Sequence, residues 1–217
     1  MQLSHVFNQR AWPGAGDVDD CTQVSGLQLV NTVAPWLPLV DIPTARRAAG
    51  DPDDGNADGG TQAELLRMLR TLYPSLAPLF RRVDGCELRY LRRHVDEGRP
   101  VSVALIGAKL PTRLRFGFTG SHRCTIARAS KGAPVRFANP LAPVYSDWQA
   151  TTWAQLAPAL EAHAGKGRAN VILGPTVAEA IATQPDVRAA LLALEGARLE
   201  ARAVALRDAS AAVAALR

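Results

Sequence analysis

The order of secondary-structure signals along the chain is the feature that most restricts its fold. Residues 20–97 carry mostly helical patterns, and residues 101–173 carry short runs rich in branched and aromatic side chains, separated by Gly, Pro or Lys-Gly turns. A helical pattern resumes at Thr176 and continues to the end. Helices grouped before strands indicate an α+β domain rather than an alternating parallel-sheet fold.

Four helices and five strands are expected before the C-terminal region. The first helix begins near Asp20, a good N-cap residue, and ends before Pro35. Thr61 and Glu64 form a capping box at the start of another helix. Residues 1–19 and 49–60 have loop composition. The other expected helices are Glu87–Glu97 and Trp153–His163, and the strands are Val101–Ile106, Arg113–Phe118, Thr125–Ala129, Val135–Ala138 and Asn170–Leu173.

The C-terminal region is expected to be a separate helical extension. Leu192, Leu199, Leu206 and Val213 recur every seven residues in an Ala-rich background. This is one stripe of a heptad rather than two, so a coiled coil and an amphipathic helix docked on its own domain both remain open. We therefore divide the chain into a domain at 1–174 and an extension at 175–217, whose residues 183–217 could mediate a homo- or hetero-oligomer.

Composition excludes several classes of protein. The chain has 217 residues, 47% of them hydrophobic, and a formal net charge of +5. Its arginines are scattered without interleaved aromatic residues, so they indicate a solvated face and not a nucleic-acid site. The longest apolar runs are too short for a membrane span. The chain opens without a secretory signal pattern, which predicts synthesis in the cytoplasm.

The cysteines indicate free thiols. Cys21, Cys86 and Cys124 are an odd number without close pairing, and no CxxC motif occurs. This pattern argues against a disulfide framework and a structural zinc site. Of the histidines, His5, His94 and His163 have no spacing that suggests a metal site. We therefore expect no metal and no cofactor.

Cys21 is positioned as a candidate nucleophile. It follows Asp20 where a loop gives way to a helix, and a helix N-terminus favours the thiolate. The glycines in Pro13-Gly14-Ala15-Gly16 would let a substrate approach the sulfur. Taken alone, Cys21 is better explained as a small buried residue. Asp19 and Asp20 are better explained by capping and solvation than by a paired-carboxylate site.

His122 and Asn139 form a candidate pair. His122 follows the turn residues Gly120-Ser121 and leads into a strand, and Asn139-Pro140 ends the next strand. Two antiparallel strands joined by the turn near Gly132 would bring Asn139 back beside His122. The Asn carbonyl could then accept a hydrogen bond from one imidazole N–H and leave the other nitrogen facing a thiol.

Together these segments resemble a known family. GDVDDCTQVSGLQLVN resembles the nucleophile helix of papain-like cysteine peptidases, especially the bacteriocin-processing type and its relatives in phage genomes. GSHRCTIARASKGAPVRFANPLAP resembles the family's His strand, turn, strand and closing Asn-Pro. The resemblance covers about residues 5–165. It implies a papain-like fold, with N-terminal helices and an antiparallel sheet.

The resemblance also implies a chemistry. Cys21 would attack a carbonyl, His122 would move the proton and Asn139 would orient the ring. Gln9, twelve residues before Cys21, is the candidate oxyanion donor, although the family's spacing is shorter and the family has Gly where this chain has Thr22.

Two functions are compatible with these expectations. The first is a thiol hydrolase that cleaves a peptide or amide bond, in protein or cell-wall peptide. It could be carried in a phage virion or tail. The second is a catalytically inert peptidase-like component of such an assembly, docked through its C-terminal helix. Cys86 and Cys124 are read as packing residues, although Cys124 shares a strand face with His122 and could be a rival thiol.

Overall fold

The computed structural model describes residues 6–11, 20–50, 60–143 and 146–214, with side chains of the last helix described as far as residue 205. The expected loop at Pro13–Gly16, Asp19, His5, most of the expected loop at 49–60 and the side chains of Leu206 and Val213 lie outside the described residues. Contacts divide the chain into two units, Met1–Ala180 and Ile181–Arg217. The division therefore falls at residue 180, inside α7, rather than at residue 174.

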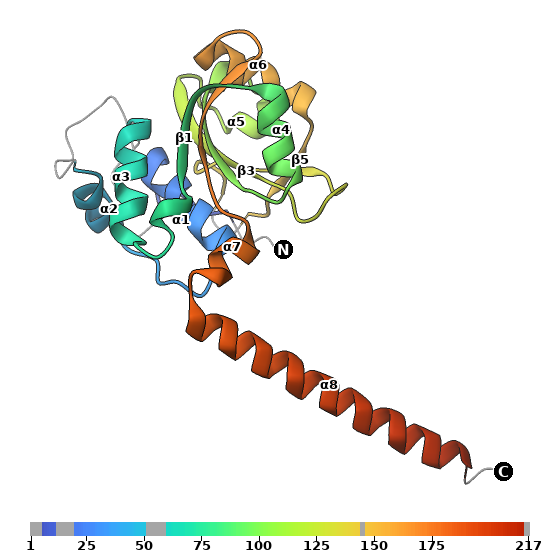
Figure 1. The fold of residues 1–217 in the computed structure, drawn as a ribbon. Helices are drawn as coiled ribbons and strands as arrows, with labels where there is room; N and C mark the ends of the chain where they lie inside the picture. Colours follow the sequence, from blue (N-terminus) through green and yellow to red (C-terminus); the bar gives the residue numbers. More distant parts are fainter. Residues whose placement is uncertain (1–5, 12–19, 51–59, 144–145, 215–217) are drawn as a thin grey trace. The chain divides into compact units, whose positions relative to one another are not determined.

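The first unit is built on one sheet of six strands, all paired antiparallel (Figure 1). Their spatial order is β1-β6-β2-β3-β4-β5. The expected α+β architecture, with N-terminal helices and an antiparallel sheet, is confirmed. The strands are β1 (Arg81–Glu87), β2 (Val101–Ile106), β3 (Ser121–Ala127), β4 (Val135–Ala138), β5 (Gln149–Thr151) and β6 (Arg168–Leu173).

Alternation along β2 separates the two faces of the sheet. Val101, Val103 and Leu105 enter one apolar core, which α4 (Leu88–Asp96) and α6 (Trp153–Ala164) cover. Ser102 points to the other face, where its hydroxyl lies 2.8 Å from that of Ser25 in α1 (Cys21–Val33). The two faces of the sheet therefore support separate layers of helices.

The N-terminal helices α1, α2 (Ile42–Ala49) and α3 (Gln62–Leu72) form the second core. Gly26 lets α1 approach α3 closely, because a Cβ there would lie 2.5 Å from Met68 Cε and 2.6 Å from Leu65 Cδ1. α3 begins with the expected capping box of Thr61 and Glu64. The expected bounds of α1, α3, α4 and α6 agree with the structure to within a residue or two.

One expected strand is wrong. The segment Arg113–Phe118 contains the short helix α5 (Thr112–Arg115) and a turn, in which Phe116 has a φ of 49° and Gly117 a φ of 82°. Two consecutive left-handed residues reverse the chain, so the segment cannot extend as a strand. Only Leu114 of α5 is buried, and the branched and aromatic composition had suggested a sheet where a turn was needed.

Some elements give no clear signal in the sequence. β1 is a charged edge strand with a bulge between Val83 and Cys86, where Gly85 has a φ of 63°. β5 has three residues and α2 has eight. The remaining short elements of this kind are η1 (Ala77–Leu79) and η2 (Gly107–Lys109), whereas α7 (Val177–Ala182) lies in the region that was expected to be helical. Short or polar elements lack the periodicity on which such predictions depend.

The second unit consists mainly of α8 (Pro185–Ala214), which confirms the expected long C-terminal helix. Leu192 and Leu199 of the heptad stripe are exposed, and so are Leu191, Leu194 and Val204. Whether this helix forms a coiled coil or an oligomer stays a prediction. Among the described helices, none has both the length and the apolar character that crossing a bilayer demands.

Candidate functional site

Cys21 is the first residue of α1 and is 8% exposed. Asp20 occupies the N-cap position but, contrary to expectation, its carboxylate does not cap the helix. It accepts hydrogen bonds of 2.9 and 2.7 Å from Nε and Nη2 of Arg46, and both residues are buried. The charge directly before Cys21 is thus balanced by a cation, and the positive end of the helix dipole acts on the sulfur.

Hydroxyl groups attach α1 to the sheet one turn after Cys21. Ser25 Oγ lies 2.8 Å from Ser102 Oγ and 2.9 Å from Thr125 Oγ1, in β2 and β3. Thr125 Oγ1 also lies 3.1 Å from the Ser25 carbonyl oxygen, to which it donates. This buried network holds the start of α1 against β3, the strand that carries His122.

His122 is held in β3 opposite Leu105 of β2, and its side chain is buried. The ring Nε2 lies 2.8 Å from Asn139 Oδ1. Asn139 directly follows β4, and Ala138 at the end of that strand pairs with Thr125 of β3. The antiparallel strands and the turn between them therefore bring His122 and Asn139 together.

The contacts of Asn139 determine which imidazole nitrogen carries the proton. Its Nδ2 donates to the Leu114 carbonyl over 2.8 Å, and its Oδ1 accepts from the Leu141 N–H over 2.9 Å. Because both contacts require the oxygen to face His122, Nε2 must be the donor to Asn139. In the neutral ring Nδ1 is then the proton acceptor.

The turn before β3 also fixes the imidazole. The Phe118 ring centroid lies 4.8 Å from that of His122, with an interplanar angle of 41°. Together with Leu114, whose carbonyl orients Asn139, Phe118 belongs to the segment that was expected to be a strand. Neither residue is recognisable from the sequence as part of the site, since an orienting backbone carbonyl carries no side-chain signal.

The Cys124 thiol interacts with His122. Burial lowers the pKa of His122, but its interactions with the Cys124 thiol and the hydrogen bond to Asn139 outweigh burial and raise this pKa above 6.5. Cys124 lies on the same strand face and is completely buried, and burial raises its own pKa. Cys124 is therefore an inaccessible thiol, although it interacts with the imidazole.

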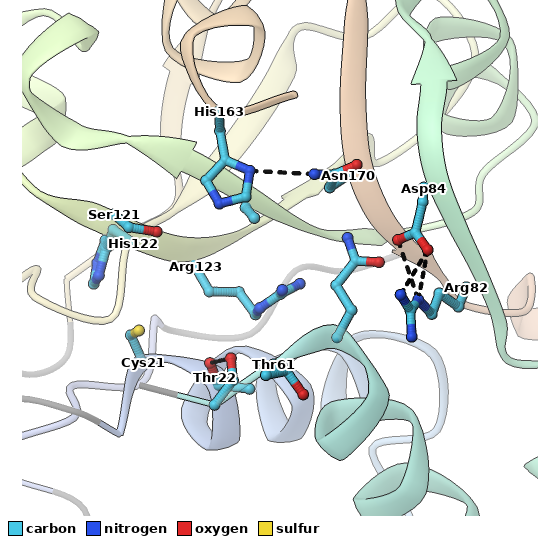
Figure 2. A pocket seen from close by; sticks show the side chains of 13 residues that line it. Cys21, Thr22, Thr61, Arg82, Asp84, Ser121, His122, Arg123, His163 and Asn170 are labelled. Atoms are coloured by element: carbon cyan, nitrogen blue, oxygen red, sulfur yellow. Dashed lines mark hydrogen bonds and ion pairs between the residues drawn. The ribbon is translucent and has the colours of Figure 1, made fainter. Parts of the chain in front are cut away.

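A cavity of about 340 Å³ opens beside Cys21 (Figure 2). Cys21, Thr22 and His122 line it, so the candidate nucleophile and the candidate base share one cavity. In Figure 2 both side chains point into the same end of the cavity. Thr22 Oγ1 donates to the Gly60 carbonyl over 2.8 Å and so ties α1 to the residues before α3.

The cavity contains further polar residues that the sequence analysis did not select. Arg123 follows His122 on β3, and Gln62 is the first residue of α3. His163, read from the sequence as unremarkable, also lines the cavity, and its Nδ1 lies 3.3 Å from Asn170 Nδ2. Because arginines are scattered along the chain, the sequence did not indicate that Arg123 is buried.

Gln9 is buried near the candidate site. Its backbone N–H donates to the Pro140 carbonyl over 2.8 Å, next to Asn139. It is not one of the described residues that line the cavity. Its role as an oxyanion donor stays a prediction.

Cys86 and His94 lie away from this cavity. Cys86 is buried in the core under α4 and α6, and burial raises its pKa. His94 lies on α4 beside Glu97, with its Nδ1 3.8 Å from a Glu97 carboxylate oxygen. Within the described ranges, no three His, Cys, Asp or Glu side chains are grouped as metal ligands.

Comparison with known proteins gives one similar structure. No protein-family model matches the chain, and no curated protein matches it. Among solved structures, the chain is similar to a crystal structure from Bacillus anthracis, of a protein presumed to be a C39-like peptidase. The TM-score is 0.48 at 13% sequence identity, and the match covers 81% of this chain and 100% of that one.

Proposed function

We propose that this protein is a cysteine-peptidase-like thiol hydrolase that cleaves a peptide or amide bond through an acyl-enzyme. One observation carries the proposal: His122 is held by Asn139 at 2.8 Å with its Nε2 as donor, and it lines the same cavity as Cys21. Cys21, His122 and Asn139 would act as nucleophile, acid–base and orienting group.

The reaction uses the two imidazole nitrogens differently. His122 Nδ1 accepts the proton of the Cys21 thiol, while Nε2 keeps its proton and its bond to Asn139. The thiolate attacks the carbonyl carbon, the C–N bond breaks, and the imidazolium gives its proton to the leaving amine. Water, deprotonated by His122, then attacks the thioester. The products are a carboxylic acid and the regenerated Cys21 thiol.

The backbone at the start of α1 would donate a hydrogen bond to the oxyanion of the tetrahedral intermediate. The backbone N–H of Cys21 lies at a helix N-terminus whose N-cap side chain is turned away to Arg46. An amide at this position is suited to donate to a negatively charged oxygen. Gln9 would supply a second donor.

Alkylation of the thiols tests the proposal. We would measure the rate of iodoacetamide labelling at each cysteine from pH 5 to 10, with peptide mapping, in the wild type and in His122→Ala. We expect labelling to concentrate at Cys21, with a thiol pKa below the reference of about 8.5, and this pKa should rise in His122→Ala. Cys124→Ala is the matched control, because it removes the other thiol near the imidazole.

Turnover would follow with a library of peptides, including cell-wall peptides, analysed by mass spectrometry. The wild type should release products and Cys21→Ala should not. Acid quenching should trap the acyl group as a mass increase on the peptide that contains Cys21. If Cys21 is labelled no faster than Cys86 and is insensitive to His122, the catalytic pair does not exist and an inert peptidase-like domain is the better reading. The association with a phage virion or tail stays a prediction of the sequence resemblance, since none of these findings bears on it.

A further inference from the structure

The cavity beside Cys21 contains a buried guanidinium group that the proposed reaction does not use. Arg123 is 5% exposed and lines the cavity. Figure 2 shows its side chain extending from β3 across the cavity, between Cys21 and the pair formed by Arg82 and Asp84. An arginine is seldom buried in this way without a partner for its charge.

Within the part of the chain that the structure describes, Arg123 has no carboxylate partner. Its Nη1 is buried and makes no hydrogen bond with the described residues. Arg46 provides the comparison, since it is similarly buried but contacts Asp20 over 2.7 Å. Burial lowers the pKa of Arg123 to about 10, so the group remains charged at neutral pH. A buried, unpaired charge is strongly unfavourable, and an anionic ligand would relieve it.

A second polar side chain in the cavity has no partner either. Gln62 is 8% exposed, and both polar atoms of its amide are buried without a hydrogen bond to any described residue. This residue is the first of α3 and lines the same cavity as Arg123 of β3. A guanidinium and an amide facing one cavity provide donors for a ligand with two acceptor oxygens.

Asp84, the single carboxylate among the described lining residues, attracts the Arg123 charge but forms its ion pair with Arg82. Asp84 bonds Arg82 with an oxygen–nitrogen distance of 2.6 Å, and it accepts twice from Arg82 Nε, over 3.1 and 2.9 Å. Arg82 and Asp84 thus balance each other, and Arg123 gives the lining an excess positive charge. His163 also lines the cavity, and its pKa is lowered by burial and by Arg123.

We propose that Arg123 and Gln62 bind a carboxylate of the substrate, next to the bond that Cys21 attacks. The position relative to the reacting bond rests on the proposed function, whereas the binding of a carboxylate does not. The carboxylate would belong either to an Asp or Glu side chain or to the free C-terminus of a peptide. The substrate class is therefore an acidic peptide or a peptide acid.

Binding to Cys21→Ala tests this without any turnover. Isothermal titration would compare four short peptides of one sequence, with Glu or Gln at one position and an acid or an amide at the C-terminus. Loss of one charge-assisted contact should weaken binding about 10- to 100-fold. Glu against Gln identifies a side-chain carboxylate, and acid against amide identifies a C-terminal one. If all four peptides bind equally, or none binds, the proposal is wrong whether or not Cys21 is a nucleophile.

Variants of Arg123 and Gln62 test whether these two residues cause the preference for a carboxylate. Arg123→Gln should abolish the preference for the carboxylate, and Arg123→Lys should retain part of it. Gln62→Leu should reduce it and keeps the test available if the Arg123 variants do not fold. Arg81→Gln, an exposed arginine on β1, is the matched control and should bind as the parent does. A preference that survives Arg123→Gln in a folded protein would overturn the assignment.

An alternative role for Arg123, stabilising the Cys21 thiolate, predicts a different experimental result. Cys21 and Arg123 interact electrostatically, so the guanidinium could act only to stabilise the Cys21 thiolate. In that case Arg123→Gln would shift the pH profile of iodoacetamide labelling upward, and the four peptides would not differ. Carboxylate binding predicts a loss of peptide selectivity that is independent of any such shift.

Discussion

Replacing Asn139 by Ala tests how the candidate base is held. Asn139 Oδ1 accepts from His122 Nε2 at 2.8 Å and its Nδ2 donates to the Leu114 carbonyl at 2.8 Å. Both His122 and Leu114 are buried, so each would lose its partner without access to water. An unsatisfied buried group costs about 1–3 kcal/mol.

The loss of these two hydrogen bonds determines how much Asn139→Ala should destabilise the protein. At about 2 kcal/mol each, Asn139→Ala should lower the free energy of unfolding by about 4 kcal/mol. For a chain of this size the melting temperature should fall by about 8–16 °C. The pKa of His122 should also fall, because the bond to Asn139 is one of the interactions that raise it.

Asn139→Asp separates the two effects. It keeps the acceptor for His122 but loses the donor to Leu114, so it should remain destabilised while the pKa of His122 rises. Calorimetry measures the stability, and the chemical shifts of the His122 ring protons across pH measure the titration. If Asn139→Ala unfolds like the wild type and His122 titrates unchanged, the orienting role assigned to Asn139 is refuted.

Three further changes test the fold and its electrostatics. Arg46→Met should cost about 3–5 kcal/mol by leaving a buried carboxylate unpaired, and Arg47→Met, at an exposed neighbour, should stay within about 0.5 kcal/mol in the same urea titration. Gly26→Ala should destabilise by about 1–3 kcal/mol through overpacking, whereas Gly196→Ala, with open space around it, should stabilise its helix by up to about 1 kcal/mol. Because folding raises the pKa of His122, its contribution is fully present below about pH 6.5 and is lost as the pH rises through the folded-state pKa. In His122→Gln the free energy of unfolding should therefore no longer fall as the pH rises from about 6.5 through the folded-state pKa of His122. An unchanged pH dependence would contradict the assignment.

The parts of the candidate site that the sequence predicted depend on local geometry. A cap-like residue before a helical pattern placed Cys21 at the start of α1, although the Asp20 carboxylate binds Arg46 instead of capping. Two strands joined by a short turn placed Asn139 beside His122. Both inferences need only the regular spacing of neighbouring elements.

The parts that could not be predicted depend on long-range packing. Cys21 and His122 are brought to one cavity by the contact of Ser25 with Thr125, and a pair of hydroxyl-bearing residues gives no signal in the sequence. Arg123 and Gln62 occupy positions where a strand and a helix start usually face water. Only the fold shows that α3 covers this end of the sheet and encloses them.

The sequence does not determine whether Cys21 or Cys124 is the candidate nucleophile, but the fold distinguishes the two thiols. Strand alternation places Cys124 on the face of β3 that carries His122, so the sequence alone permits either thiol as its partner. That face packs into the core, where burial raises the pKa of Cys124 and no substrate can reach its sulfur. Cys21 instead begins a helix at the rim of a cavity, beside a charged guanidinium. A thiolate is stabilised by a helix N-terminus and by a cation and is disfavoured in an apolar core. The fold therefore favours Cys21 over Cys124 as the candidate nucleophile, and Cys124 packs under the candidate base.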